Sequence, residues 1–230
     1  NTGLLREIKK EKIKEVAKMY KKFPIHSVPS ALADNLSLQL PYLMIPKIFD
    51  LTTNGYFTLA NKIVLLPASL IATPVAQVYY QNMTKLRNEK IKFRKFFYDT
   101  LKKLILIAIP IAIFFYFTST YIFPLIFGVK WEQAGYIAKY LSLIFFIRFI
   151  VSPLSISFMV TFELEKIALW QYLYLITSSL LFIFFLFCKY ELETFLIAYV
   201  FHEYILYLLY LYLIYSTIMK FEPTRLKGGV

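Results

Sequence analysis

The amino-acid sequence predicts an all-α protein, a polytopic transmembrane helix bundle of about six spans. Hydrophobic residues make up 59% of the chain and charged residues only 17%, against roughly 45–50% and about 25% in soluble domains. The mean hydropathy is correspondingly high, at +0.58. The apolar residues also gather in runs of about 20 residues, which is the length that crosses a bilayer as a helix.

Six apolar segments follow one another along the chain. Residues 104–129 and 167–188 contain no charged side chain at all, and the region before residue 104 is divided by a polar turn at 50–55. Prolines occur inside several segments, and we expect Pro41 and Pro67 to bend their helices, with ordinary packing as the alternative. The expected spans are residues 29–49, 55–80, 104–129, 134–161, 167–188 and 195–219.

The net charge of +12 is distributed unevenly between the apolar segments. Residues 6–22 and 85–103 are rich in Lys and Arg, whereas the connection at 50–54 has none. The positive-inside rule therefore places both ends of this chain in the cytoplasm. Because the basic residues lie between apolar runs, we assign them to membrane topology and anionic membrane lipids, and not to nucleic-acid binding.

The chain divides into three regions: a cytoplasmic basic amphipathic linker helix at 1–24, a six-span transmembrane lobe at 25–219 and a cytoplasmic tail at 220–230. In the first region Leu5, Ile8 and Val16 recur at helical spacing, so we expect this helix to lie on lipid head groups. A solvated linker helix is the alternative. Because the chain begins with Asn1 and has no signal peptide, we expect its natural N-terminus to lie upstream.

Ionisable side chains inside the spans are the sharpest functional signal. A charge near the bilayer centre costs roughly 2.5–3.5 kcal/mol, so it usually faces a cavity or a partner. Arg148 lies halfway along its span, and we expect it to line a substrate pathway; an ion pair with Glu203 or Asp34 is the alternative. Lys62 is a second candidate, although it could reach the interface by snorkelling.

Amide side chains at membrane depth extend this predicted pathway: Asn35, Gln39, Asn61 and Gln77. Asp34, Glu203 and His202 are candidates for ion coupling or for an ion pair. His202 and Glu203 are adjacent, so their side chains point in different directions along a helix.

The sequence contains no recognisable catalytic set. It has two histidines, the single cysteine Cys188, no Gly-rich phosphate loop and no metal-ligand spacing. We therefore expect no metal, no cofactor and no enzymatic activity. An enzyme would have to depend on Asp34, Glu203 and His202 alone.

An ordered series of short segments points to a family. The segments are YKKFP at 20–24, PSALADN at 29–35, QLP at 39–41, GYFTLA at 55–60, AQVY at 76–79, FGVKWEQAG at 127–135 and SPLS at 152–155. The series resembles the C-terminal half of the Wzx-type polysaccharide and O-antigen flippases. These belong to the multidrug/oligosaccharidyl-lipid/polysaccharide exporter superfamily, and the resemblance extends to about residue 185.

This resemblance implies one lobe of a two-lobed transporter, with the N-terminal lobe of the same protein as its missing partner. It implies export of an undecaprenyl-diphosphate-linked glycan, such as a lipopolysaccharide O-antigen unit, across the bacterial cytoplasmic membrane by alternating access. Basic residues of the family cavity meet the diphosphate, and Arg148 and Lys62 are the matching candidates. A polysaccharide polymerase and glycosyltransferases are further implied partners.

Three alternatives stay open. A drug/cation antiporter of the same superfamily should prefer acidic cavity residues, whereas the deep charges here lean basic. A non-transporting membrane module of a polysaccharide assembly complex is the second. A membrane glycosyltransferase or ligase is the third, and the short outer connections of this chain argue against it.

Overall fold

The computed structural model describes residues 22–222, and this part of the chain is helical without strands. The predicted all-α fold is therefore confirmed. The helices are α2 (Lys22–Ile48), α3 (Leu51–Pro67), α4 (Thr73–Leu86), α5 (Lys90–Phe127), α6 (Glu132–Leu154), the short α7 (Ser157–Val160), α8 (Leu164–Cys188) and α9 (Leu192–Lys220). Most of the predicted linker helix at 1–24 and of the tail at 220–230 lies outside the described residues.

Within the described residues, five segments are long and apolar enough to cross a membrane: Leu51–Leu86, Lys90–Phe127, Val129–Val160, Leu164–Cys188 and Leu192–Lys220. The chain is a multi-pass membrane protein. The sixth expected span, α2, is not among these five segments. Its 27 residues cover about 40 Å as a helix, which is enough to cross, but Asp34, Asn35 and Gln39 make it more polar.

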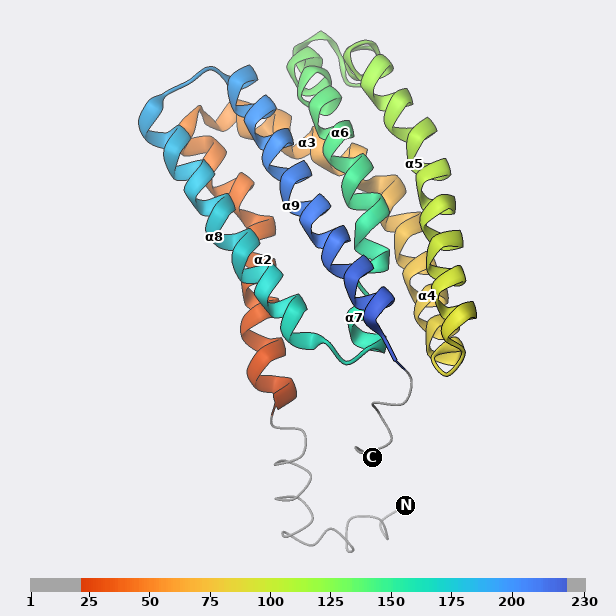
Figure 1. Ribbon diagram of the computed structural model, residues 1–230. Helices are drawn as coiled ribbons and strands as arrows, with labels where there is room; N and C mark the ends of the chain where they lie inside the picture. The colour runs from red at the N-terminus through yellow and green to blue at the C-terminus, as the bar shows by residue number, and fades with distance from the viewer. Residues whose placement is uncertain (1–21, 223–230) are drawn as a thin grey trace, which may run out of the picture.

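Successive helices run up and down through the bundle (Figure 1). The start of α2, the turn between α4 and α5, the connection from α6 to α8 and the end of α9 lie at one end of the bundle, and the other three connections lie at the opposite end. Basic residues are concentrated at the first of these ends, in the segment from Lys85 to Lys103. The described ends of the chain, at the start of α2 and the end of α9, therefore lie at the same end of the bundle (Figure 1).

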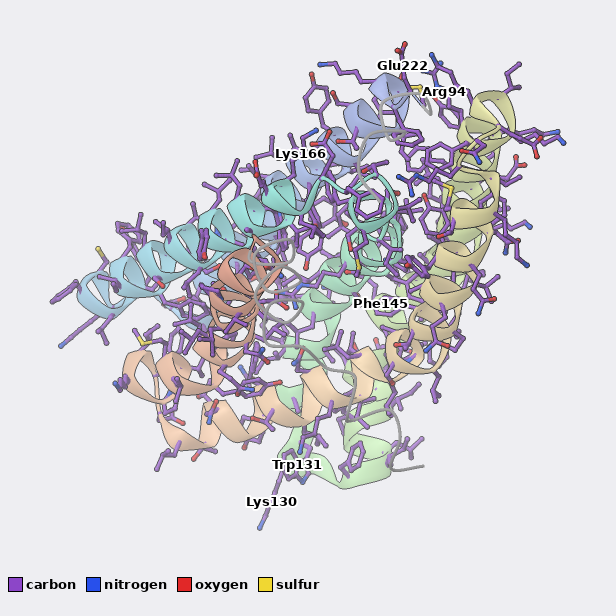
Figure 2. All side chains as sticks on the ribbon, turned by 90° about the horizontal axis from the view of Figure 1, so that it is seen from below. Arg94, Lys130, Trp131, Phe145, Lys166 and Glu222 are labelled. Carbon is purple, nitrogen blue, oxygen red and sulfur yellow. The ribbon has the colours of Figure 1, made fainter. Side chains whose placement is uncertain are left out.

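Helix α6 forms the centre of the bundle. It packs against α5, α3 and α9, while α2 packs mainly against α8. Phe145, which is fully buried, lies in the middle of the molecule (Figure 2). Against α5 the packing is especially close, because a Cβ atom on Gly135 would lie 2.5 Å from the backbone oxygen of Ser119. Small residues at such seams let two membrane helices approach.

The second span is interrupted where two prolines stand close together. A π-helical segment, η1 (Ala68–Ala72), joins α3 to α4 between Pro67 and Pro74, and the span bends there (Figure 1). A proline removes a helical hydrogen bond, and prolines and π-bulges are both known causes of helix kinks. The bend expected at Pro67 is therefore present, whereas α2 continues as one helix through Pro41.

The first turns of α5 differ from the sequence prediction. Residues 85–103 were expected to form a connection, but α5 begins at Lys90 and only a short turn precedes it. Phe93, Phe97, Thr100 and Leu104 are buried at helical spacing, so this charged stretch is amphipathic and packs as a helix.

The beginning of α5 is tied to the end of α9. Arg94 donates a hydrogen bond to the carbonyl oxygen of Met219, and the rings of Phe93 and Phe221 lie 5.0 Å apart. Lys90 forms an ion pair with Glu222, with 3.5 Å between nitrogen and oxygen. Figure 2 places Arg94 and Glu222 close together at this end of the molecule.

Candidate functional site

Arg148 is held by a buried carboxylate. Its Nε donates to Oε2 of Glu203 over 2.7 Å and its Nη2 donates to Oε1 over 2.9 Å, so the ion pair is bidentate. The Glu203 side chain is 0% exposed and the Arg148 side chain is 16% exposed. The structure thus contains the ion pair with Glu203 that is the alternative prediction for Arg148.

Tyrosine hydroxyls complete the hydrogen bonding of this pair. Tyr174 of α8 donates to Oε1 of Glu203 and accepts from Nη2 of Arg148, over 2.6 Å in the second case. Tyr199 of α9 accepts a longer bond of 3.3 Å from the same nitrogen. Buried charges are tolerated where their remaining donors and acceptors are satisfied in this way. The cluster of Arg148, Glu203, Tyr174 and Tyr199 joins α6, α8 and α9.

A cavity of about 230 Å³ lies beside this cluster. Arg148 and Tyr199 line one part of it, and polar side chains of α2 and α3 line another. Nδ2 of Asn61 donates to the hydroxyl of Tyr42 over 2.5 Å, which joins α3 to α2. The lining residues are Ser37, Leu38, Gln39, Pro41, Tyr42, Phe57, Asn61, Leu65, Arg148 and Tyr199.

The geometry limits what Arg148 can offer to a ligand. Glu203 occupies the edge formed by Nε and Nη2, and Tyr174 also bonds to Nη2. Nη1 forms no hydrogen bond with any other residue in the described part of the chain. A ligand in the cavity can therefore meet a single guanidinium nitrogen, and it does not meet the two-pronged fork that favours bidentate binding of phosphate.

Three of the six predicted pathway residues meet at this cavity, namely Gln39, Asn61 and Arg148. The other three do not line it: Lys62, Asn35 and Gln77 are exposed. The amide of Asn35 donates to the carbonyl oxygen of Ala31 in its own helix, over 2.7 Å.

The predicted coupling residues Asp34, His202 and Glu203 do not form one group in the structure. Asp34 is partly buried and lies close enough to Arg148 for an electrostatic interaction, but it forms none of the ion pairs between described residues. His202 is 3.1 Å from Oγ1 of Thr177 through its Nε2 and takes no part in the bidentate pair. Within residues 22–222, no group of three or more His, Cys, Asp or Glu residues is placed to hold a metal ion.

The tyrosines of the cluster were not predicted. A signal for them exists, because Tyr199, Glu203 and Tyr207 follow one another at intervals of four and so share one face of α9. Tyr207 also presents its ring to the guanidinium of Arg148, at 5.7 Å from the ring centre. A row of hydroxyls around a membrane carboxylate indicates a buried polar face.

Comparison with known families identifies the chain. The sequence model of a family described as polysaccharide biosynthesis protein matches residues 7–136. The chain belongs to this polysaccharide biosynthesis family. Comparison with curated proteins and with solved structures gives no match. The matched range includes Gln39 and Asn61 of the cavity and ends before Arg148, so the family match and the ion pair are independent observations.

Proposed function

We propose that this chain is part of a transporter that moves a lipid-linked oligosaccharide across the bacterial cytoplasmic membrane by alternating access. Membership of a polysaccharide biosynthesis family and a multi-pass helix bundle support this assignment. The observation that carries it is the polar cavity between α2, α3, α6 and α9, because a sugar head group needs a hydrated or hydrogen-bonding route through apolar helices.

The chemistry of the cavity suits sugar hydroxyls and a single anionic oxygen. Gln39 and Asn61 bring amide groups to the cavity wall, and Arg148 brings a charged donor. The cavity, at about 230 Å³, is smaller than the roughly 300–1,000 Å³ of most ligand pockets. In this proposal it holds part of the glycan, and a second lobe of the protein supplies the facing wall.

Substitution of one glutamine tests the proposal without disturbing the ion pair. Gln39→Leu removes the amide from the cavity while keeping the size of the side chain. We expect glycan export to fall about fivefold at unchanged protein abundance, the effect of about one hydrogen bond. Gln77→Leu is the matched control, because Gln77 is also an exposed glutamine in a membrane helix but does not line the cavity. Equal export by the two variants would defeat the proposal.

A drug/cation antiporter remains the second candidate. Cation binding requires a carboxylate that a substrate can reach. Glu203 is fully buried and engaged by Arg148, so this function would depend on Asp34, which is partly buried and forms none of the ion pairs between described residues. A non-transporting membrane module of an assembly complex is the third candidate, and it would leave export intact in both glutamine variants.

We also propose that the basic end of the bundle faces the cytoplasm. Cys188 is a free, exposed thiol and the last residue of α8, and the α8–α9 connection that follows it lies at the opposite end (Figure 1). Asn88 is exposed in the turn before α5. An impermeant thiol reagent added to intact cells should label Cys188 and should spare Asn88→Cys placed in a Cys188→Ser background. The reverse labelling would invert the proposed orientation.

A further inference from the structure

A second cavity, of about 350 Å³, lies between α4 and α5 and is separate from the polar cavity. Its walls are mostly apolar: Pro74, Val75 and Val78 come from α4, and Leu104 and Ile107 come from α5. The rings of Tyr79 and Phe96 stack at 5.8 Å in its wall. The volume falls in the range of ordinary ligand pockets. We call it the α4–α5 groove.

Lys103 is the one charged residue among those that line the α4–α5 groove. Lys103 is the last charged residue before the apolar run of residues 104–127, and this run covers about 36 Å as a helix. Because the hydrocarbon core of a bilayer is about 30 Å thick, Lys103 stands at the depth of the lipid head groups. Its ammonium group forms none of the ion pairs between described residues, although Asp99 precedes it by one helical turn.

Asn82 adds a neutral polar group to the same groove. Its Nδ2 donates to the carbonyl oxygen of Val78 over 2.8 Å, which leaves Oδ1 to accept a hydrogen bond. The α4–α5 groove therefore combines an apolar wall, a cation at head-group depth and a hydrogen-bond acceptor. A hydrocarbon chain, a phosphate and a hydroxyl-bearing head group match these three features.

We propose that the α4–α5 groove binds an anionic glycerophospholipid of the surrounding bilayer, with one acyl chain against Val75 and Ile107 and its phosphate at Lys103. The lipid sits outside the polar cavity and this inference does not rest on the proposed transport function. Charge complementarity selects the occupant, because a zwitterionic lipid places a second cation beside Lys103.

Native mass spectrometry of the purified full chain tests this site, with phosphatidylglycerol and phosphatidylcholine of identical acyl chains as probes. We expect phosphatidylglycerol to bind about fivefold more tightly, which corresponds to one Lys at an anionic surface. Lys103→Gln should reduce phosphatidylglycerol binding to the phosphatidylcholine level. Lys102→Gln is the matched control, since Lys102 is an exposed neighbour outside the groove, and it should bind like the parent protein.

Two further experiments distinguish binding of the lipid's acyl chain from binding of its head group. Val78 is exposed, so Val78→Trp should fill the groove without unfolding the protein and should lower the binding of both lipids. Glycerol phosphate, which has no acyl chain, should not displace bound phosphatidylglycerol. The proposal is overturned if Lys102→Gln and Lys103→Gln act equally, if Val78→Trp has no effect on either lipid, or if glycerol phosphate competes.

Discussion

Two regions of α6, around Gly135 and around Arg148, pack against neighbouring helices in different ways. Near its beginning, Gly135 brings α6 so close to α5 that no side-chain atom fits between Gly135 and Ser119. Nearer its end, Arg148 pairs with Glu203 of α9 and lines a polar cavity that residues of α2 and α3 also border. The first contact depends on shape and the second depends on satisfied hydrogen bonds. Both regions therefore stabilise α6, but only the region around Arg148 also borders a cavity that a ligand can enter.

Removal of the arginine should have the largest effect. Arg148→Ala leaves the fully buried carboxylate of Glu203 without its bidentate partner, and breaking a buried pair in this way costs about 3–5 kcal/mol. We expect a strong fall in protein abundance and in the thermal unfolding temperature in detergent.

The double variant Arg148→Met/Glu203→Gln serves as the control for this prediction. It removes both charges and keeps the side-chain volumes, so most of the lost stability should return. Normal abundance of Arg148→Ala would instead indicate that water or a ligand, and not the ion pair, stabilises this end of α6.

A single methyl group should damage the tight end of α6. The Cβ atom of Gly135→Ala would meet the Ser119 carbonyl oxygen at 2.5 Å, so α5 and α6 must separate, at about 1–3 kcal/mol. Gly55→Ala is the matched control. Nothing lies within 4 Å of a Cβ atom there, and alanine favours a helix by up to about 1 kcal/mol. Thermal unfolding of both variants should give shifts of opposite sign; shifts of equal sign would show that α5 and α6 have room to adjust.

Loss of one hydroxyl should have the smallest effect. Tyr174→Phe removes the bonds to Glu203 and Arg148, and interhelical hydrogen bonds in membranes contribute about 0.6 kcal/mol on average. Tyr204→Phe is the control, because the hydroxyl of Tyr204, next to Glu203 on α9, makes no hydrogen bond with another described residue. We expect Tyr174→Phe to lower the thermal unfolding temperature and Tyr204→Phe to leave it unchanged. Equal unfolding temperatures for the two variants would mean that the Tyr174 hydroxyl does not stabilise the ion pair.

The spans could be predicted because bilayer thickness imposes a length on every apolar run. The predictions at 104–129, 167–188 and 195–219 lie within two residues of the observed helices or inside them. The beginning of α5 was missed because its Lys and Arg residues were interpreted as a connection. The buried positions Phe93, Phe97, Thr100 and Leu104 share one face, and only the neighbouring helices determine that this face is covered.

The candidate site could be predicted in part. Depth alone singled out Arg148 and restricted its ion-pair partners to Glu203 or Asp34, and helical spacing could have added Tyr199. The expected depth in the bilayer did not distinguish Gln39 and Asn61, which line the cavity, from Gln77 and Lys62, which do not. Helices in a membrane associate through the shapes of their surfaces, so the side chains that face the same cavity depend on packing angles that no single helix encodes.

The link between α5 and α9 has a mechanical consequence. The first turns of α5, residues 90–103, extend about 20 Å beyond the apolar run, and Arg94 and Lys90 hold the end of α9 there. The end of α9 cannot move away from α5 without breaking these two contacts. Because α9 also carries Glu203 and Tyr199, the helix that holds Arg148 in place is itself anchored to α5 at the membrane surface.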